Sequence, residues 1–300
     1  MPISKRLVAA AAMLAFAGFA SPTRADDAFR DRLAHAQGKL ASAMVQKLAA
    51  SKKPMIVISP ASVAGAAAAI DLGASASLRT ALHGLLGFHP DADVPGDLAS
   101  LRDSIGRLGS AKDQTNYPLT FASSVVFDDS VALYPAAPMA LKQAGVDFAV
   151  KDLRVPETIA DVNRLVAERT HGLIPEIVDR NVAGASLLVL NALHFKDRWK
   201  TPFDRSDTQP VAFRRVGANP VTVSMMHLPQ GKYLFRQDKQ FVGIEMPYAQ
   251  ERFAMVVVTT RGEQPAAPAA FAGTGEWLAG KGFAAASGEL ALPHFDVSAS

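Results

Sequence analysis

The residue types that most often carry catalysis are scattered along this sequence. None of the seven histidines stands in an H-E-x-x-H pattern, and no serine occupies a G-x-S-x-G or S-x-x-K pattern. The chain has no cysteine, which excludes thiol chemistry, disulfides and thiolate metal sites. His171 and His294 have no partner nucleophile nearby in the sequence, so we expect surface or turn histidines and a protein that is not an enzyme.

One stretch resembles a nucleotide-binding loop in its spacing alone. Residues 275–281 have the glycine and lysine spacing of a phosphate loop. However, Gly282 stands where a Ser or Thr would hold magnesium, and no buried strand precedes the stretch. A chance match is the better interpretation, so we expect no cofactor and no metal.

A polar residue interrupts the most apolar part of the chain. Residues 187–195 form a nearly continuous apolar run, which predicts a strand covered on both faces and central in a large sheet. Asn191 lies in its middle. A buried amide without partners costs about 2–7 kcal/mol, so we expect the side chain of Asn191 to be hydrogen-bonded.

The elements around this strand predict an α+β fold, because helices dominate the first half and strands follow in succession. Ser59-Pro60 predicts a capped helix over residues 61–72, apolar almost all round. Further helices are expected from residue 29 to 48 and at 78–86, 98–108, around Met139, at 157–169 and up to about 279. Strands are expected at 55–58, 119–127, 146–150, 187–195, 211, 221–226, 233–235, 243–246, 253–259 and 289–297.

Three stretches of the sequence together resemble the serpin family of protease inhibitors, in order and in spacing. The likeness runs from about residue 27 to the end and is sharpest over 163–248. Its residues are Ile58-Ser59-Pro60-Ala61-Ser62-Val63 with Gly73 and Leu85-Leu86-Gly87-Phe88; Asn163 with Thr170-His171-Gly172-Leu173-Ile174, then Asn191 to Trp199 and Pro202-Phe203; and Val223 to His227, Met246-Pro247-Tyr248 and Leu292-Pro293-His294-Phe295.

The resemblance implies a serpin-like fold, with N-terminal helices packed on a large central mixed β-sheet and further smaller sheets. It also implies roles in sheet opening for four residues, which are structural and not catalytic. Asn191 would meet the start of the second helix, at Ser59 and Ser62, where the sheet opens. Trp199 would end the same strand at the top of the sheet, where a loop first inserts. Asp197 and Leu173 depart from the family pattern, each mildly.

By the same resemblance, about a hundred further residues would follow the last predicted strand. They would carry another central strand, a histidine partner for Asn191, the exposed reactive loop and further core strands. None of these is present in this sequence, so we expect residues 26–300 to be a C-terminally incomplete serpin-like domain.

The function that the resemblance implies is inhibition of a serine-type endopeptidase by a suicide-substrate mechanism. A protease cuts the loop as substrate, and the cut loop then inserts into the central sheet of a metastable fold. The partner would be a target serine protease, with cysteine proteases as a second option, and the inhibitor would be a monomer. The alternatives are a non-inhibitory serpin-like binding or carrier protein, a truncated inactive serpin, and an exported hydrolase with an unrecognised site.

The first 25 residues are typical of an export signal. Lys5 and Arg6 precede fourteen apolar or small residues, Leu7 to Ala20, and Ala25 ends an expected cleavage site. Without residues 1–25 the chain has 31 − 3 = 28 basic residues against 28 acidic ones. We therefore expect a secreted protein, extracellular or periplasmic, that binds neither nucleic acid nor, after cleavage, a membrane.

Overall fold

The computed structural model of the chain describes residues 11–15, 38–50, 56–86 and 119–295, the last range with short gaps. The chain divides into two compact units. Ser59–Lys196 is called here the three-stranded unit, and Met1–Ile58 together with Asp197–Ser300 the six-stranded unit, after the sheet that each contains. The prediction of one serpin-like domain over 26–300 stays a prediction.

Helices of the three-stranded unit begin where the sequence places a cap or a proline. Ser59 caps the first of them and Pro60 follows at its first turn, as predicted. Pro156 similarly lies in the first turn of α6. The helices are α2 (Pro60–Asp71), α3 (Ala76–Leu86), α5 (Ala137–Gln143) and α6 (Pro156–Arg169), and the strands are β2 (Leu119–Asp128), β3 (Asp147–Lys151) and β4 (Leu187–Phe195).

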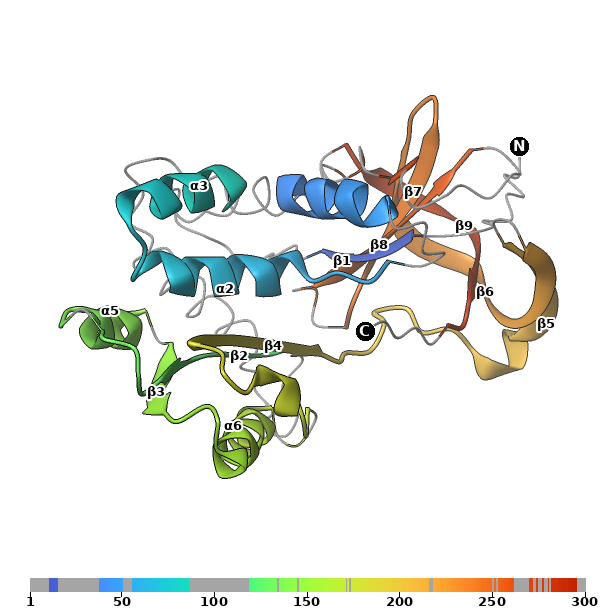
Figure 1. The fold of residues 1–300 in the computed structure, drawn as a ribbon. Coiled ribbons are helices and arrows are strands. Elements are labelled where there is room, and N and C mark those ends of the chain that lie inside the picture. The colour runs from blue at the N-terminus through green and yellow to red at the C-terminus, as the bar shows by residue number, and fades with distance from the viewer. Residues whose placement is uncertain are drawn as a thin grey trace. The chain divides into compact units, whose positions relative to one another are not determined.

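The sheet of this unit is mixed, with strand order β3-β2-β4. β2 pairs parallel with β3 and antiparallel with β4. Because side chains alternate along a strand, the sheet has two apolar faces. One packs Val126 and Leu190 against α6, and the other packs Val125 against α2 and α5. Figure 1 shows α2 and α6 on opposite sides of β2 and β4.

The prediction that residues 187–195 form a strand is confirmed, but the prediction that this strand is interior is wrong for the described chain. β4 ends the sheet, and β2 is its one strand neighbour among the described residues. Leu188, Leu190 and Ala192 are nevertheless buried. The apolar run therefore reports that both faces of β4 are covered, and it carries no information about what lies along its edge.

Strands of the six-stranded unit follow the order β1-β8-β7-β6-β5, and β9 pairs with β6 off this path. All the pairings are antiparallel. The strands are β1 (Ala11–Ala15), β5 (Gln209–Arg215), β6 (Ala218–Gln237), β7 (Phe241–Pro247), β8 (Ala254–Thr260) and β9 (Ala284–Pro293). Residues 38–49 are also helical, overlapping the first helix expected from residue 29 to 48, and short 3-10 turns lie at η1 (Arg180–Val182) and η2 (Arg205–Asp207).

Three sequence-based boundaries are wrong. Residues 56–58 are not a strand. The strands expected at 221–226 and 233–235 are one long strand, β6, because β9 pairs along both halves with an irregularity between Leu228 and Gly231. β9 begins at Ala284, five residues before the expected start at Glu289. The helix expected at 98–108 lies outside the described residues, as does most of the export signal, apart from β1.

Two apolar clusters hold the six-stranded sheet together. Val256 and Val258 pack with Phe271 and Trp277, while Val257 packs on the other side with a second group. The guanidinium of Arg236 lies 4.3 Å from the centre of the Trp277 ring, a cation–π contact. Among the described helices, none combines the length and apolar character that crossing a bilayer requires.

Glu245 is a buried carboxyl in this sheet, with 3% of its surface exposed. Its Oε2 has no hydrogen-bond partner among the described residues, and burial raises the pKa of the carboxyl. The folded chain therefore holds this proton more tightly than the unfolded chain does. The contribution of Glu245 to stability is greatest below its unfolded pKa, about 4.3, and declines as the pH rises through its folded pKa.

Glutamine cannot ionise, so Glu245→Gln removes the cost of burying a charged carboxylate. The free energy of unfolding of the variant should therefore rise relative to that of the wild type as the pH increases from 4 to 7. Urea unfolding at both pH values measures the difference. Glu176→Gln, at an exposed position of the other unit, is the matched control and should show no such trend. If the wild type became more stable relative to Glu245→Gln between pH 4 and pH 7, the raised pKa of Glu245 would be contradicted.

Candidate functional site

The first two predicted site residues lie together at the start of α2. The hydroxyl of Ser59 accepts a hydrogen bond from the backbone N–H of Ser62 at 3.2 Å and donates to the hydroxyl of Ser62 at 2.8 Å. The capping role expected of Ser59 is thus confirmed. The link to Ser62 satisfies a backbone donor that the helix leaves unpaired, and it fixes where α2 begins.

Asn191 lies on β4 directly opposite Ser123 of β2. Alternation along the strand puts both on the face that carries Val125 and Val189, which packs on α2 and α5. The two polar atoms of the Asn191 amide and the hydroxyl of Ser123 are buried and have no hydrogen-bond partner among the described residues. The prediction that Asn191 is hydrogen-bonded is therefore wrong for this part of the chain, and its partner must come from elsewhere if it has one.

The structure brings together the elements that the resemblance names, but not the side chains. α2 contacts β4 directly. No hydrogen bond between the described residues joins Ser59 or Ser62 to Asn191. The sheet-opening role of these residues stays a prediction. What the geometry adds is an unsatisfied polar row, Ser123 and Asn191, which crosses the sheet at the face covered by α2.

The opposite face of β4 carries His194. Burial, reinforced by the charge of Lys196, lowers the pKa of His194, and its Nδ1 has no hydrogen-bond partner among the described residues. The imidazole is consequently neutral at physiological pH. Together with Asn191, it makes β4 a strand with unsatisfied polar groups on both faces near its C-terminal end.

Asn163 is a structural residue whose role the sequence did not reveal, although it belongs to the motif that carries the resemblance. From α6, its Oδ1 accepts hydrogen bonds from the backbone N–H groups of Ile177 at 2.9 Å and Val178 at 3.0 Å. Its Nδ2 donates to the carbonyl of Val178 at 2.8 Å. Asn163 thereby ties α6 to the segment that leads into β4.

Trp199, the fourth predicted site residue, belongs to the six-stranded unit and does not end β4, which stops at Phe195. It forms an isolated β-bridge with Tyr248 and stacks on its ring, with the centroids 4.6 Å apart. Burial, together with the charge of Asp197, raises the pKa of Tyr248 to about 12. The neighbouring Lys200 N–H donates to the carbonyl of Pro247 at 3.0 Å, which fixes the chain as it enters this unit.

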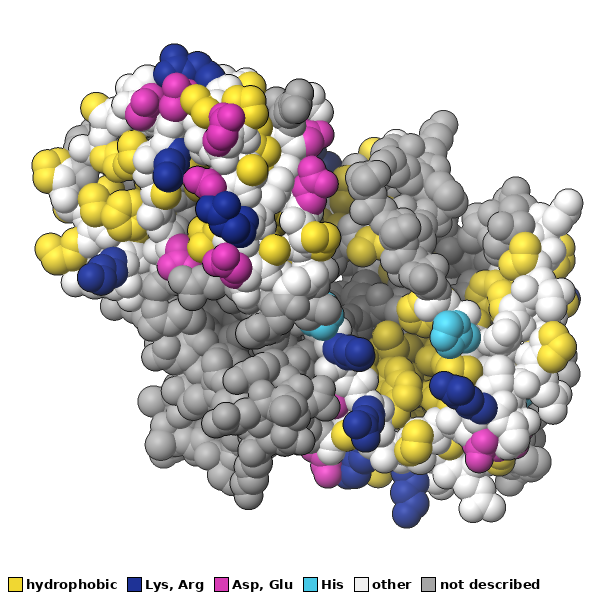
Figure 2. Space-filling view, turned by 90° about the horizontal axis from the view of Figure 1, so that it is seen from below, with side chains coloured by type: hydrophobic (Ala, Val, Ile, Leu, Met, Phe, Trp, Pro, Cys, Tyr) yellow, Lys and Arg dark blue, Asp and Glu magenta, His cyan; other side chains and the backbone are white. Residues whose placement is uncertain are grey.

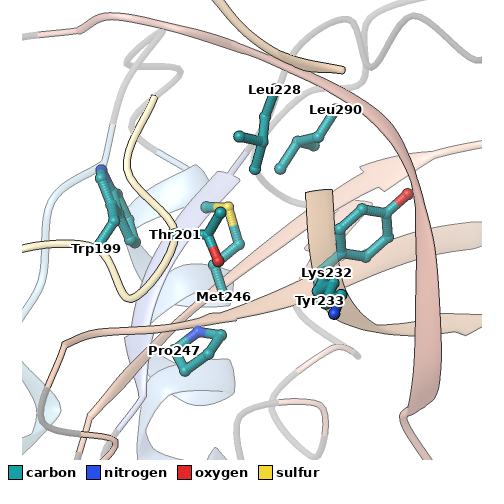
Figure 3. A pocket seen from close by; sticks show the side chains of 8 residues that line it. All are labelled: Trp199, Thr201, Leu228, Lys232, Tyr233, Met246, Pro247 and Leu290. Atoms are coloured by element: carbon teal, nitrogen blue, oxygen red, sulfur yellow. The ribbon is translucent and has the colours of Figure 1, made fainter. Parts of the chain in front are cut away.

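A hollow of about 260 Å³ lies beside Trp199 within the six-stranded unit. Figure 3 shows Trp199 and Tyr233 on either side of Met246, with two leucines above it. The volume includes space open to solvent, and the polar groups at the hollow belong to Thr201, Lys232 and Tyr233. No arrangement of nucleophile, base and oxyanion donors is assembled there.

One group of carboxylates, Asp128, Asp129 and Asp152, is close enough to share a cation. The guanidinium of Arg154 already provides the positive charge beside two of these carboxylates, since it donates a hydrogen bond to Asp152 at 2.7 Å and forms an ion pair with Asp129 at 3.5 Å. Asp128 is occupied as well, because it accepts from the backbone N–H of Leu153. Lys, Arg, Asp and Glu side chains also lie interspersed on the face seen in Figure 2.

Comparison with known proteins agrees with this geometry. The family model described as Serpin (serine protease inhibitor) matches residues 35–300. The chain belongs to the serpin family. It is 26% identical over 254 residues to Iripin-8 of Ixodes ricinus, which covers 82% of this chain and 63% of the relative. It is also 26% identical over 209 residues to the human leukocyte elastase inhibitor, covering 68% of this chain and 54% of that protein.

Solved structures show the same fold. The crystal structure of maspin superposes with a TM-score of 0.76 at 20% identity, covering 89% of this chain and 74% of that one. The structure of cleaved Serpin 42Da gives a TM-score of 0.73 at 24% identity, covering 88% of this chain and 72% of that one. The α+β serpin fold is thus confirmed. The chain spans about 60% of the length of the first curated relatives.

Replacing Asn163 by Ala should lower the free energy of unfolding by about 2–4 kcal/mol, since three hydrogen bonds of about 1 kcal/mol each are lost and partly buried backbone groups lose their partner. Urea unfolding measures the change. Asn181→Ala, whose side chain bonds only to exposed Asp179, is the control and should stay within about 0.5 kcal/mol of the wild type. Equal losses of stability in the two variants would show that the hydrogen bonds of Asn163 to Ile177 and Val178 do not stabilise the fold.

Replacing Asn191 by Leu in the 300-residue chain should leave stability unchanged or raise it by about 1–2 kcal/mol, because a buried amide without partners is exchanged for an apolar side chain of similar volume. Thermal and urea unfolding measure this. Val189→Ala, on the same face of β4, is the matched control and should destabilise. A large loss on Asn191→Leu would mean that the amide has a partner beyond the described residues.

Proposed function

We propose that this chain supplies the sheet-bearing part of an inhibitor of serine-type endopeptidases that acts as a suicide substrate. The observation that carries the proposal is the edge of β4. Among the described strands, only β2 pairs with β4, so one row of its backbone N–H and C=O groups is available to a further strand. A strand that adds there gains main-chain hydrogen bonds as well as burial.

The surroundings of β4 support insertion at this edge. The Ser123–Asn191 row leaves polar groups unsatisfied inside the sheet. Each buried polar group without a partner costs about 1–3 kcal/mol. An inserted backbone or side chain that formed hydrogen bonds with these groups would recover part of this free energy. Asn163 anchors α6 to Ile177 and Val178 through three hydrogen bonds, which fixes the segment that leads into β4 against this helix.

In the proposed mechanism, the protease provides the chemistry. It attacks a loop that follows β9 in the family pattern, forms an acyl-enzyme and cuts the loop, whose N-terminal part then inserts beside β4. Insertion carries the attached protease along before the ester is hydrolysed. The inhibitor contributes no catalytic residue, and its target is a serine protease, with cysteine proteases as the second option. The similarity to the human leukocyte elastase inhibitor supports a protease as the partner, without identifying which one.

We also propose that residues 1–25 direct export, so that the inhibitor acts in the extracellular space or the periplasm, as a monomer. A non-inhibitory binding or carrier role, or an inactive truncated serpin, is the second candidate. The segment preceding the reactive loop discriminates between them. Small residues such as Ala and Thr permit insertion beside β4, whereas bulky or proline-rich residues block it.

The complete gene product, mixed with trypsin-, chymotrypsin- and elastase-like proteases, should form with one of them a complex that survives boiling in detergent. Gel electrophoresis and mass spectrometry should show the mass of the protease plus the cut inhibitor. A protease whose active-site serine is blocked is the control and should give no such band. Clean cleavage without a complex, for all three proteases, would leave only the binding role.

A further inference from the structure

The helices α2 and α3 of the three-stranded unit are joined by a contact between two buried titratable side chains. Asp71, the last residue of α2, is 3% exposed, and His83 of α3 is 4% exposed. The Nε2 atom of His83 lies 3.2 Å from the Oδ1 atom of Asp71. Charged side chains are rarely buried unless they are paired, so each of these two groups is placed to compensate the charge of the other.

Arg79, one turn before His83 on α3, reaches the same end of α2. Its Nε lies 3.6 Å from the Oδ2 of Asp71, and its Nη2 donates a hydrogen bond to the carbonyl of Asp71 at 3.2 Å. α2 has no basic residue in its own last turn. The C-terminus of a helix carries partial negative charge, to which Asp71 adds a carboxylate. α3 therefore supplies the positive charge that the end of α2 lacks.

The exposure of α3 gives this contact weight. Among the described side chains of the helix, only His83 is buried, and Leu82 is half-buried. Leu78, an apolar residue one turn and a half before His83, is 44% exposed. For the described side chains, α3 is thus attached to α2 by charge more than by an apolar face.

The turn of α2 that holds Asp71 also packs on the sheet. Ala69 is buried in one cluster with Val125 of β2. Leu72, at the end of the same turn, packs against this cluster, as does Val189 of β4. The charge of the contact between Asp71 and His83 therefore acts on the part of α2 that lies on β2 and β4.

The charge of His83 decides how strong the contact is. Histidine is the side chain whose charge changes between pH 5 and 8. An imidazolium here is attracted by the carboxylate of Asp71 and by the helix C-termini, since His83 also lies in the last turn of α3. Arg79 and burial act in the opposite direction. These groups are all the charged or titratable residues of the two helices.

We propose that Asp71 and His83 form a pH-sensitive clasp, in which protonated His83 holds α3 on the last turn of α2 and loss of the proton releases it. The docked helix then binds the proton more tightly than the released helix does. Docking is therefore strongest at mildly acidic pH and weakens as the pH rises. This inference does not depend on protease inhibition, because it involves neither the edge of β4 nor the reactive loop.

Hydrogen exchange of the complete gene product at pH 5 and pH 8, corrected for the intrinsic effect of pH on exchange, tests the clasp. Protection of residues 67–84 should fall about tenfold between the two pH values, since one proton is linked to docking. His83→Gln, which is neutral throughout, should show the low protection at both pH values. His83→Lys, which keeps a positive charge, should show the high protection at both. His294→Gln, at an exposed position of the six-stranded unit, is the matched control and should keep the wild-type response.

NMR of the histidine-labelled wild type follows the ring of His83 directly, so the test does not depend on variants that fold. Protonation of this ring and the rise in protection of α3 should have the same midpoint. An imidazole that keeps one protonation state from pH 5 to pH 8 would overturn the proposal. So would protection that does not change with pH, or a His83→Gln variant that retains the wild-type response.

Discussion

The constraint on which this structure depends is that the backbone groups of a strand must be paired along both edges. β4 and β8 are each covered above and below by apolar contacts, so neither can turn a side to water in the way that an ordinary edge strand does. Among the described residues, β2 is the one strand neighbour of β4, whereas β8 pairs with β7 on one side and with β1 on the other. The second edge of β4 is where the described chain can gain a partner, and the proposed function concerns that edge.

The buried polar groups give the edge of β4 a particular character. Asn191 and Ser123 face each other across the β2–β4 ladder without a hydrogen-bond partner among the described residues, which is an unfavourable arrangement in a packed sheet. A sheet that held only apolar side chains at this point would be more stable as it stands. Groups that gain their bonds only when the sheet changes are suited to a fold that stores free energy and releases it on rearrangement.

Sequence reasoning located most elements because their local signals are strong. Ser59-Pro60 fixed the start of α2, and the apolar run at 187–195 fixed β4. It failed where the answer depends on distant residues. The apolar run indicates that both faces of β4 are covered, but only the pairing of whole strands shows that β4 ends its sheet among the described residues. The resemblance implied that Trp199 ends the same strand as Asn191, whereas β4 stops at Phe195 and Trp199 stacks on Tyr248 in the six-stranded unit.

The site was predicted in part for the same reason. The capping role of Ser59 is local, so it could be read from the residue type and the following proline. The role of Asn163 could not, since its three hydrogen bonds reach residues 14 and 15 positions further along the chain. The apolar segment at 11–15 has the composition of an export signal and also that of a buried strand, and composition alone does not distinguish the two.

The most direct test of the central claim is hydrogen exchange at Leu187–Phe195 in the complete gene product, before and after a protease cuts its reactive loop. Insertion of the cut loop beside β4 should slow the exchange of these amides and raise the thermal midpoint of unfolding. Exchange that stays the same or becomes faster after the cut, with no rise in the midpoint, would contradict the account, because it would show that the edge of β4 takes up no strand.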